Sequence, residues 1–209
     1  MKIRASADFF LSLLLIFLSN SLPYALLFLS AAAVHEAGHI TFLKVYKIKK
    51  PVLSLGLLGG CITADMTRLS YRQEASVYLG GAVFNILACI VSLGVMRRVS
   101  GELLIFFFFA SLFYAALNLL PISTLDGGRA LECVLLSLSD NPFCVLRVCR
   151  YVSLVFSSVT VGLSAALLFC FKGNLTLVLL LAWIVFTAYF QSPPDAAPRT
   201  PQLRRHSTG

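Results

Sequence analysis

The sequence is 209 residues long; 58% of its residues are apolar and only 12% are charged. This composition, with a mean hydropathy of +0.87, excludes a soluble globular protein, which needs about twice that share of charged residues, and a disordered chain, which would not carry 17 phenylalanines. The formal charge of +8 does not indicate a nucleic-acid partner, because the basic residues stand singly or in small groups beside apolar runs.

Six apolar runs predict six transmembrane helices, so the expected fold class is an all-α polytopic membrane protein. The predicted spans cover about 7–20, 23–46, 72–96, 102–122, 151–171 and 174–190. The first span has the basic start of a signal peptide, but the residues that follow it, 20–23, offer no small-residue cleavage site. We therefore expect this span to be retained, and the six spans to form one intramembrane domain over residues 1–190.

The segments outside the spans have a different character. In 47–70, glycines interrupt an apolar stretch (PVLSLGLLGGCIT), which favours a short membrane-associated β-hairpin over a helix. In 123–150, a short helix is expected over about 127–138, started by Asp126. The tail, 191–209, is rich in proline and polar residues, and we expect it to be disordered.

The lysines and arginines predict the orientation of the spans. With the N-terminus inside, 14 of the 17 basic residues fall on the inner side. The outer side then holds Arg97, Arg98 and Lys172. By the positive-inside rule, both termini are expected in the cytoplasm, and the protein is expected in the bacterial inner or plasma membrane as a multi-pass protein.

The second predicted span contains the run HEAGH at residues 35–39, an H-E-x-x-H pattern. Residues i and i+4 of a helix share a face, so His35 and His39 can bind one metal ion. Glu36 is offset around the helix and can address a water on that metal instead. The alternative is a polar contact between packed helices, but such a contact does not need an acid between two bases.

A catalytic zinc site needs a third protein ligand and an open position for water. Asp126 follows the fourth span, which crosses the membrane in the same direction as the second, so Asp126 is expected at the same face as the histidines. The alternative for Asp126 alone is a helix N-cap. His206 lies in the polar tail and is a poor candidate. A rival hypothesis takes the third ligand from one of the glutamates Glu74, Glu102 and Glu132.

Three motifs together carry a family resemblance. The HEAGH run lies in an early span, NLLPISTLDGGR at residues 118–129 ends a later one, and GAVFN at 81–85 lies between them. In this arrangement the chain resembles the site-2 protease family of intramembrane zinc metalloproteases. Two positions depart from the family pattern: Ala82 stands where proline is common, and Ser-Thr-Leu at 123–125 stands where Pro-Pro-Leu is common.

The resemblance covers about residues 22–135 and implies roles for individual side chains. The zinc ligands that it implies are His35, His39 and Asp126. It further implies that Glu36 is the general base, and that Asn85 and Asn118 bind the substrate backbone or hold the loop that carries Asp126. Ordinary hydrogen bonding between helices is the alternative for both asparagines. The segment after the second span is similar to the family's membrane-associated hairpin, which offers an edge strand to an unwound substrate.

The function implied by the resemblance is an intramembrane zinc endopeptidase that cleaves membrane proteins near the cytoplasmic face in regulated signalling. The expected cofactor is one zinc ion per chain, and the expected partners are a membrane-protein substrate, the lipid bilayer and a membrane regulator. The layout is similar to the branch that contains a sporulation sigma-factor-processing protease, but without that branch's C-terminal CBS domain. The alternatives are a catalytically silent homologue that binds membrane proteins and, with less support, a transporter, for which an internal repeat is missing from the sequence.

Overall fold

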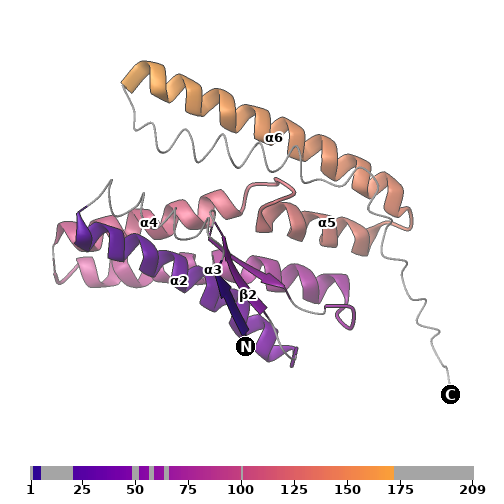
Figure 1. Cartoon of the computed structure of the whole chain (residues 1–209), viewed down its shortest axis with the longest axis horizontal. Coiled ribbons are helices and arrows are strands. Elements are labelled where there is room, and N and C mark those ends of the chain that lie inside the picture. The colour runs from indigo at the N-terminus through magenta and orange to yellow at the C-terminus, as the bar shows by residue number, and fades with distance from the viewer. Residues whose placement is uncertain are drawn as a thin grey trace.

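The computed structural model describes residues 2–5, 21–48, 52–56, 59–63, 66–99 and 101–171, and this part of the chain is mostly helical (Figure 1). In chain order the elements are β1 (Lys2–Ala5), α2 (Leu22–Val45), β2 (Val52–Gly56), β3 (Gly59–Thr63), α3 (Tyr71–Met96), α4 (Glu102–Asn118), α5 (Asp126–Leu138) and α6 (Pro142–Phe171). The predicted spans at 7–20 and 174–190 and the tail at 191–209 lie outside the described residues, so six spans stay a prediction.

Three of the described helices are long and apolar enough to cross a membrane: α2, α3 and the part of α6 from Pro142 to Leu163. The fourth predicted span is shorter than expected, because α4 ends at Asn118 rather than 122. The proline at 121 explains this end, since a proline disfavours helical geometry in the residue before it. With 17 residues, α4 is about 26 Å long, slightly less than the ~30 Å thickness of the hydrocarbon core.

Helix α6 begins nine residues before the predicted start at 151. Its start has a local cause: the side-chain Oδ1 of Asn141 accepts a hydrogen bond from the backbone N–H of Cys144 at 3.2 Å, and Pro142 occupies the first helical position. Hydropathy alone missed this start because Arg147 and Arg150 interrupt the apolar run. The ends of α2, α3 and α5 differ from their predicted bounds by only one residue.

Helix α3 lies at the centre of the packing and contacts α2, α4 and α5, while α6 contacts α5. The close approach of α2 and α3 depends on glycine: a Cβ added to Gly38 would lie 2.2 Å from the carbonyl oxygen of Gly80. Small residues of this kind let helices pack closely in a bilayer, where burial of apolar surface gives little driving force.

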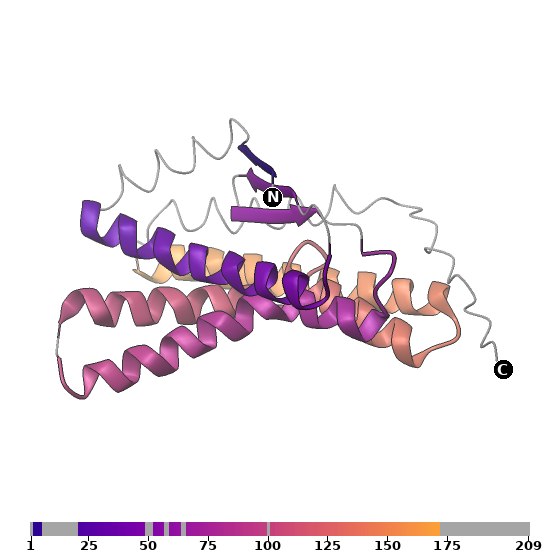
Figure 2. The same cartoon turned by 90° about the horizontal axis from the view of Figure 1, so that it is seen from below.

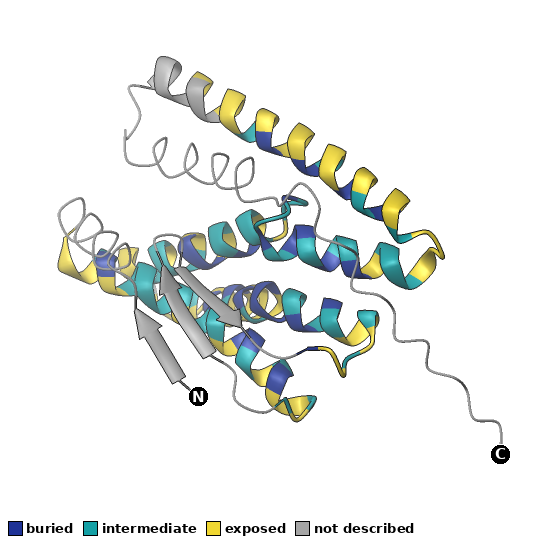
Figure 3. Ribbon diagram, turned by 45° about the vertical axis from the view of Figure 1, so that its right-hand side comes forward, coloured by how far each residue is buried: buried dark blue, intermediate teal, exposed yellow. Residues whose placement is uncertain are grey.

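The outer surface of the helices is apolar. Figure 3 shows exposed residues along the outer side of α6 and buried ones along the side that faces α5. Large exposed apolar side chains include Ile86, Ile90 and Val91 of α3, Ile105 and Phe109 of α4, and Tyr151, Val155 and Val159 of α6. Exposed apolar side chains in such number suit contact with lipid rather than water.

The three strands form one sheet in the order β1–β2–β3. Strand β1 pairs with β2 in parallel, and β2 pairs with β3 in antiparallel register, with Leu53 opposite Ile62. Strand β3 contacts α2, and the sheet lies on the side of α2 away from α4 (Figure 2). Strands β2 and β3 lie within the segment 47–70, and the membrane-associated β-hairpin expected there stays a prediction.

Candidate metal centre

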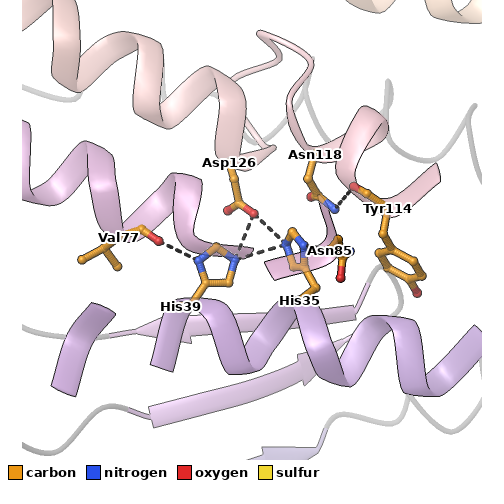
Figure 4. Close-up of polar contacts among 7 residues, drawn as sticks. All are labelled: His35, His39, Val77, Asn85, Tyr114, Asn118 and Asp126. Atoms are coloured by element: carbon orange, nitrogen blue, oxygen red, sulfur yellow. Dashed lines mark hydrogen bonds and ion pairs between the residues drawn. The ribbon is translucent and has the colours of Figure 1, made fainter. Parts of the chain in front are cut away.

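The two histidines of the HEAGH run lie on the same face of α2, one turn apart, and both are buried. Their Nε2 atoms are 3.1 Å from one another, and the two rings meet edge to face. Figure 4 shows both imidazoles pointing away from α2 toward the start of α5. The spacing of four residues gives this arrangement directly, because it returns to the same helix face.

Asp126 is the first residue of α5, and its side chain completes the cluster (Figure 4). Its Oδ2 atom lies 2.9 Å from Nε2 of His35 and 3.1 Å from Nε2 of His39. Among the described residues, these three form the one group of histidine, cysteine, aspartate and glutamate side chains close enough to hold a metal ion. We call His35, His39 and Asp126 the metal cluster.

The backbone around Asp126 is packed tightly enough to fix its position. A Cβ at Gly127 would lie 2.4 Å from the carbonyl oxygen of Leu119, and one at Gly128 would lie 2.1 Å from that of Ile122. The two glycines therefore let the first turn of α5 fold directly against the loop after α4. The side chain of Ile122, which is fully buried, packs with Leu125 in the same loop.

The metal cluster fits zinc in both its donor atoms and its dimensions. Two imidazole nitrogens and one carboxylate oxygen form a common catalytic zinc ligand set, which leaves a fourth position open for water. Ligand atoms about 2.0–2.1 Å from a tetrahedral zinc are about 3.3 Å apart. The three edges of the cluster, 2.9, 3.1 and 3.1 Å, lie close to that value.

Asp126 is suited to act as an anionic ligand. Burial would raise the pKa of its carboxyl group, but the close contacts with His35 and His39 outweigh that effect and lower the pKa to about 2. The side chain is therefore a carboxylate at neutral pH.

Helix α3 holds the other nitrogen of each imidazole ring. Nδ1 of His39 lies 2.8 Å from the backbone carbonyl oxygen of Val77, and Nδ1 of His35 lies 3.4 Å from the side-chain amide of Asn85. Gly81 lies between these two residues, and a Cβ there would come within 2.6 Å of Nε2 of both histidines. The backbone of α3 thus closes one side of the metal cluster.

The structure places the remaining predicted residues as follows. Glu36 is half-buried in α2 next to His35 and is not part of the metal cluster. Asn85 is fully buried and contacts His35 rather than the loop that carries Asp126. Asn118, at the end of α4, donates a hydrogen bond from its side-chain amide to the backbone carbonyl oxygen of Tyr114 at 3.1 Å.

The glutamates proposed by the rival hypothesis lie outside the metal cluster. Glu74 accepts a hydrogen bond from the Tyr78 hydroxyl within α3, and Glu102 accepts one from the Tyr24 hydroxyl. Within the described part of the chain, the carboxylate that the fold brings to the histidines is that of Asp126. His206 lies outside the described residues.

Comparisons with known proteins were made for the sequence and for the fold. No family model matches the chain. The chain is 25% identical over 187 residues to a zinc metalloprotease of Methanocaldococcus jannaschii. That match covers 86% of this chain and 52% of the relative, so the chain spans about half the length of the relative.

A solved structure with a similar fold is the site-2 protease from Methanocaldococcus jannaschii. The TM-score is 0.65 at 23% sequence identity, and the match covers 91% of this chain and 90% of that structure. The helices described above therefore have the arrangement of a site-2 protease.

Proposed function

We propose that this chain is a zinc metalloendopeptidase of the site-2 protease family that hydrolyses peptide bonds of membrane-embedded or membrane-associated proteins, and its likeness to the two Methanocaldococcus jannaschii proteins supports this. The observation that carries this proposal is the metal cluster, formed by two histidines of an apolar helix and an aspartate 91 residues away from the first of them in the sequence. Two buried histidines and a half-buried aspartate placed together among apolar helices are costly unless a function retains them.

The metal cluster would hold zinc through Nε2 of both histidines and an oxygen of Asp126. When bound there, zinc would supply a Lewis acid for the peptide carbonyl and lower the pKa of a water molecule. Glu36 follows His35 directly and faces about 100° away from it around α2. Its carboxylate accepts the proton of the attacking water and returns it to the leaving amine nitrogen, as the C–O bond forms and the C–N bond breaks.

The position of the site in an apolar helix supports a substrate in the membrane. A transmembrane helix keeps its carbonyl groups in internal hydrogen bonds, so it must unwind locally before hydrolysis. The sheet of β1, β2 and β3 would offer its edge to the unwound segment, since backbone groups at an edge can pair with an added strand. A membrane regulator and a role in regulated signalling belong to the same proposal.

The orientation follows from the charges. With 14 of 17 basic residues inside, both termini would lie in the cytoplasm, and the metal cluster would lie near the cytoplasmic face of the cell membrane. The sporulation-type branch is a proposal about layout alone and implies no substrate.

The test compares three forms of the full-length protein in detergent: the parent, Glu36→Gln, and Asp140→Ala as a control at an exposed acid. Each is incubated with synthetic peptides that correspond to single transmembrane helices, and the products are identified by mass spectrometry. We expect the parent and the control to cleave, and Glu36→Gln to keep its zinc and lose several orders of magnitude in rate. Cleavage by Glu36→Gln at the parent rate would refute the proposed chemistry.

The alternative of a catalytically silent homologue predicts a different result. Such a protein would bind the peptides without products in all three forms. The presence of both histidines, the aspartate and the glutamate favours the enzyme, because a silent homologue has no need to keep a base beside a metal cluster.

A further inference from the structure

One face of α3 contacts both histidines of the metal cluster. Val77, Gly81 and Asn85 are spaced four residues apart, so they lie along the same face of the helix. The carbonyl oxygen of Val77 accepts a hydrogen bond from His39, and the side-chain amide of Asn85 contacts His35. Gly81 lies between them and packs against both imidazole rings. We call these three residues the orienting face.

The contact with Val77 fixes the tautomer of His39, that is, which ring nitrogen carries the hydrogen. A backbone carbonyl oxygen can only accept a hydrogen bond, so the hydrogen must be on Nδ1 of His39. In the neutral ring, Nε2 then carries a lone pair and can bind a metal. The 2.8 Å distance between Nδ1 and the Val77 oxygen thus selects Nε2 as the ligand atom of His39.

His35 needs the same tautomer, with its hydrogen on Nδ1, because its Nε2 atom faces Asp126 at 2.9 Å. Its Nδ1–H then requires an acceptor, and the neighbouring group is the side-chain amide of Asn85. Asn85 is fully buried, and its Oδ1 has no hydrogen-bond partner among the described residues. A half-turn of the amide about its last side-chain bond exchanges Oδ1 and Nδ2, so that Oδ1 can accept from Nδ1 of His35.

Gly81 sets the distance between α3 and the ligand atoms. A Cβ at this position would lie 2.5 Å from Nε2 of His39 and 2.6 Å from Nε2 of His35. Both distances are far below a van der Waals contact, so any side chain at position 81 would displace the imidazoles or α3. Gly94, in the same helix, has open space where its Cβ would be.

We propose that the orienting face of α3 holds both histidines as Nε2 ligands, and that Asn85 is a positioning residue whose Oδ1 accepts a hydrogen bond from Nδ1–H of His35. Gly81 contributes by leaving the space that the two rings occupy. This proposal rests on the proposed zinc function and deepens it. It gives Asn85 a role in orienting a metal ligand, in place of the contacts with substrate or with the Asp126 loop expected from the sequence.

The first experiment measures metal binding by the full-length protein in detergent. Zinc affinity is determined by competition with a chromophoric chelator, and Co²⁺ is substituted to record its visible absorption spectrum. The variants are Asn85→Leu, which removes the acceptor at similar volume, and Asn85→Asp, which keeps an acceptor and removes the donor. Ser111→Ala is the control, because Ser111 is also fully buried, on α4, and its hydroxyl has no partner among the described residues.

We expect Asn85→Leu to weaken zinc binding by about 10–100-fold, the range typical of groups that orient a metal-bound histidine, and to change the Co²⁺ spectrum. Asn85→Asp should bind zinc more tightly than Asn85→Leu, and Ser111→Ala should match the parent. Parent-like affinity and spectrum in Asn85→Leu would overturn the proposal. So would an Asn85→Asp variant as weak as Asn85→Leu, because it would show that Asn85 acts as a donor.

A second pair of variants keeps the test decisive if Asn85→Leu does not fold. Gly81→Ala should lose zinc binding, whereas Gly94→Ala should keep it at the parent level. Equal zinc affinity in these two variants would overturn the role of Gly81. The proposed protease function is judged separately: a parent protein that binds zinc but cleaves no peptide would refute that function, while the zinc titrations still decide the role of α3. A parent that binds no zinc would overturn both.

Discussion

At the scale of single residues, Asp126 is the side chain whose role had two interpretations. A helix N-cap places a side-chain oxygen on the free N–H groups of the first turn. In the structure, Leu125 holds the N-cap position of α5 and makes no side-chain cap hydrogen bond. The Oδ2 atom of Asp126 is directed instead at Nε2 of His35 and His39. The geometry therefore favours a metal ligand.

This geometry predicts the effect of replacing Asp126. Asp126→Ala should lower zinc affinity by more than the ~10–100-fold typical of a group that only orients a ligand, and it should abolish cleavage. Asp126→Ser should do the same, whereas serine would restore most of a cap that is worth about 1 kcal/mol. Metal content by mass spectrometry, measured beside cleavage, checks both variants.

Asp140→Ala is the control, because Asp140 is exposed after the end of the same helix, α5. It should retain the zinc content and activity of the parent. Full zinc occupancy in Asp126→Ser would show that the third ligand lies elsewhere, and the three glutamates of the rival hypothesis would be examined next.

The sequence predicted the members of this site unequally well. The pair His35 and His39 depends only on helix periodicity, which is local. Asp126 depends on two spans running in the same direction, which the charge distribution indicated. The carbonyl oxygen of Val77 was missed, because a backbone contact leaves no trace in residue type. Gly81 was noticed as part of a motif, but the space it provides is visible only when α2 and α3 are packed together.

At the scale of elements, the first turn of α5 is positioned by its contact with the loop after α4. The most restrictive point is Gly128, where a Cβ would lie 2.1 Å from the carbonyl oxygen of Ile122. That oxygen also accepts a hydrogen bond from the N–H of Leu125 at 2.8 Å, so the loop cannot easily move away. The location of Asp126 therefore depends on the absence of a side chain two residues later.

We predict that Gly128→Ala destabilises the protein by about 1–3 kcal/mol, as forced overpacking does, and lowers zinc affinity by displacing Asp126. The control is Gly162→Ala in α6, where a Cβ would meet nothing within 4 Å. In a helix this control should be neutral or slightly stabilising, because alanine is favoured over glycine by about 1 kcal/mol. Thermal unfolding and zinc titration of both variants check the prediction, and equal effects would contradict it.

Helix α6 also holds the loop that leads to Asp126. The hydroxyl oxygen of Ser153, which is buried, accepts a hydrogen bond from the backbone N–H of Ser123 at 3.0 Å and lies 3.2 Å from the Ser123 hydroxyl. A buried hydroxyl between α6 and this loop ties the two elements together. Since none of the three residues of the metal cluster lies in α6, α6 acts on the loop rather than on the ligands themselves.

Ser153→Ala should therefore lower the free energy of unfolding by about 1 kcal/mol, the usual value of one hydrogen bond. Ser158→Ala is the matched control in the same helix, since the Ser158 hydroxyl is exposed and donates to the carbonyl oxygen of Leu154 within α6. Denaturant unfolding of the two variants in detergent gives the comparison. A Ser153→Ala variant as stable as Ser158→Ala would show that the contact does not hold the loop.

At the scale of the whole molecule, hydropathy predicted where the helices lie but not how they pack against one another. Apolar runs located α2, α3, α4 and the body of α6, because a span must satisfy its backbone hydrogen bonds internally. The predicted end of α4 and the predicted start of α6 were wrong, because a proline and a capping asparagine, rather than hydropathy, set these two boundaries. The central place of α3 could not be predicted, because it depends on which small residues face which helix.

The position of the metal cluster along α3 relates the site to the two membrane faces. His39 contacts Val77, in the second turn of α3, and Arg98 follows the other end of that helix. The separation of 21 positions along the chain corresponds to about 30 Å of helix, close to the thickness of the hydrocarbon core. In the proposed membrane arrangement, the metal cluster and Arg98 would therefore lie toward opposite faces of the membrane.

Topology reporters test this arrangement directly. We predict that fusions after Arg98 and after Lys172 give extracytoplasmic signals, and that a fusion at Gly209 gives a cytoplasmic one, because only three of the 17 basic residues fall on the outer side in this orientation. A dual reporter, alkaline phosphatase and a fluorescent protein at each position, gives a positive signal on either side. A cytoplasmic signal after Arg98 would move the metal cluster to the outer face, since α3 separates the two by a full membrane thickness. In that case the cleaved bonds would lie near the outer surface, and the charge distribution would have misled the orientation.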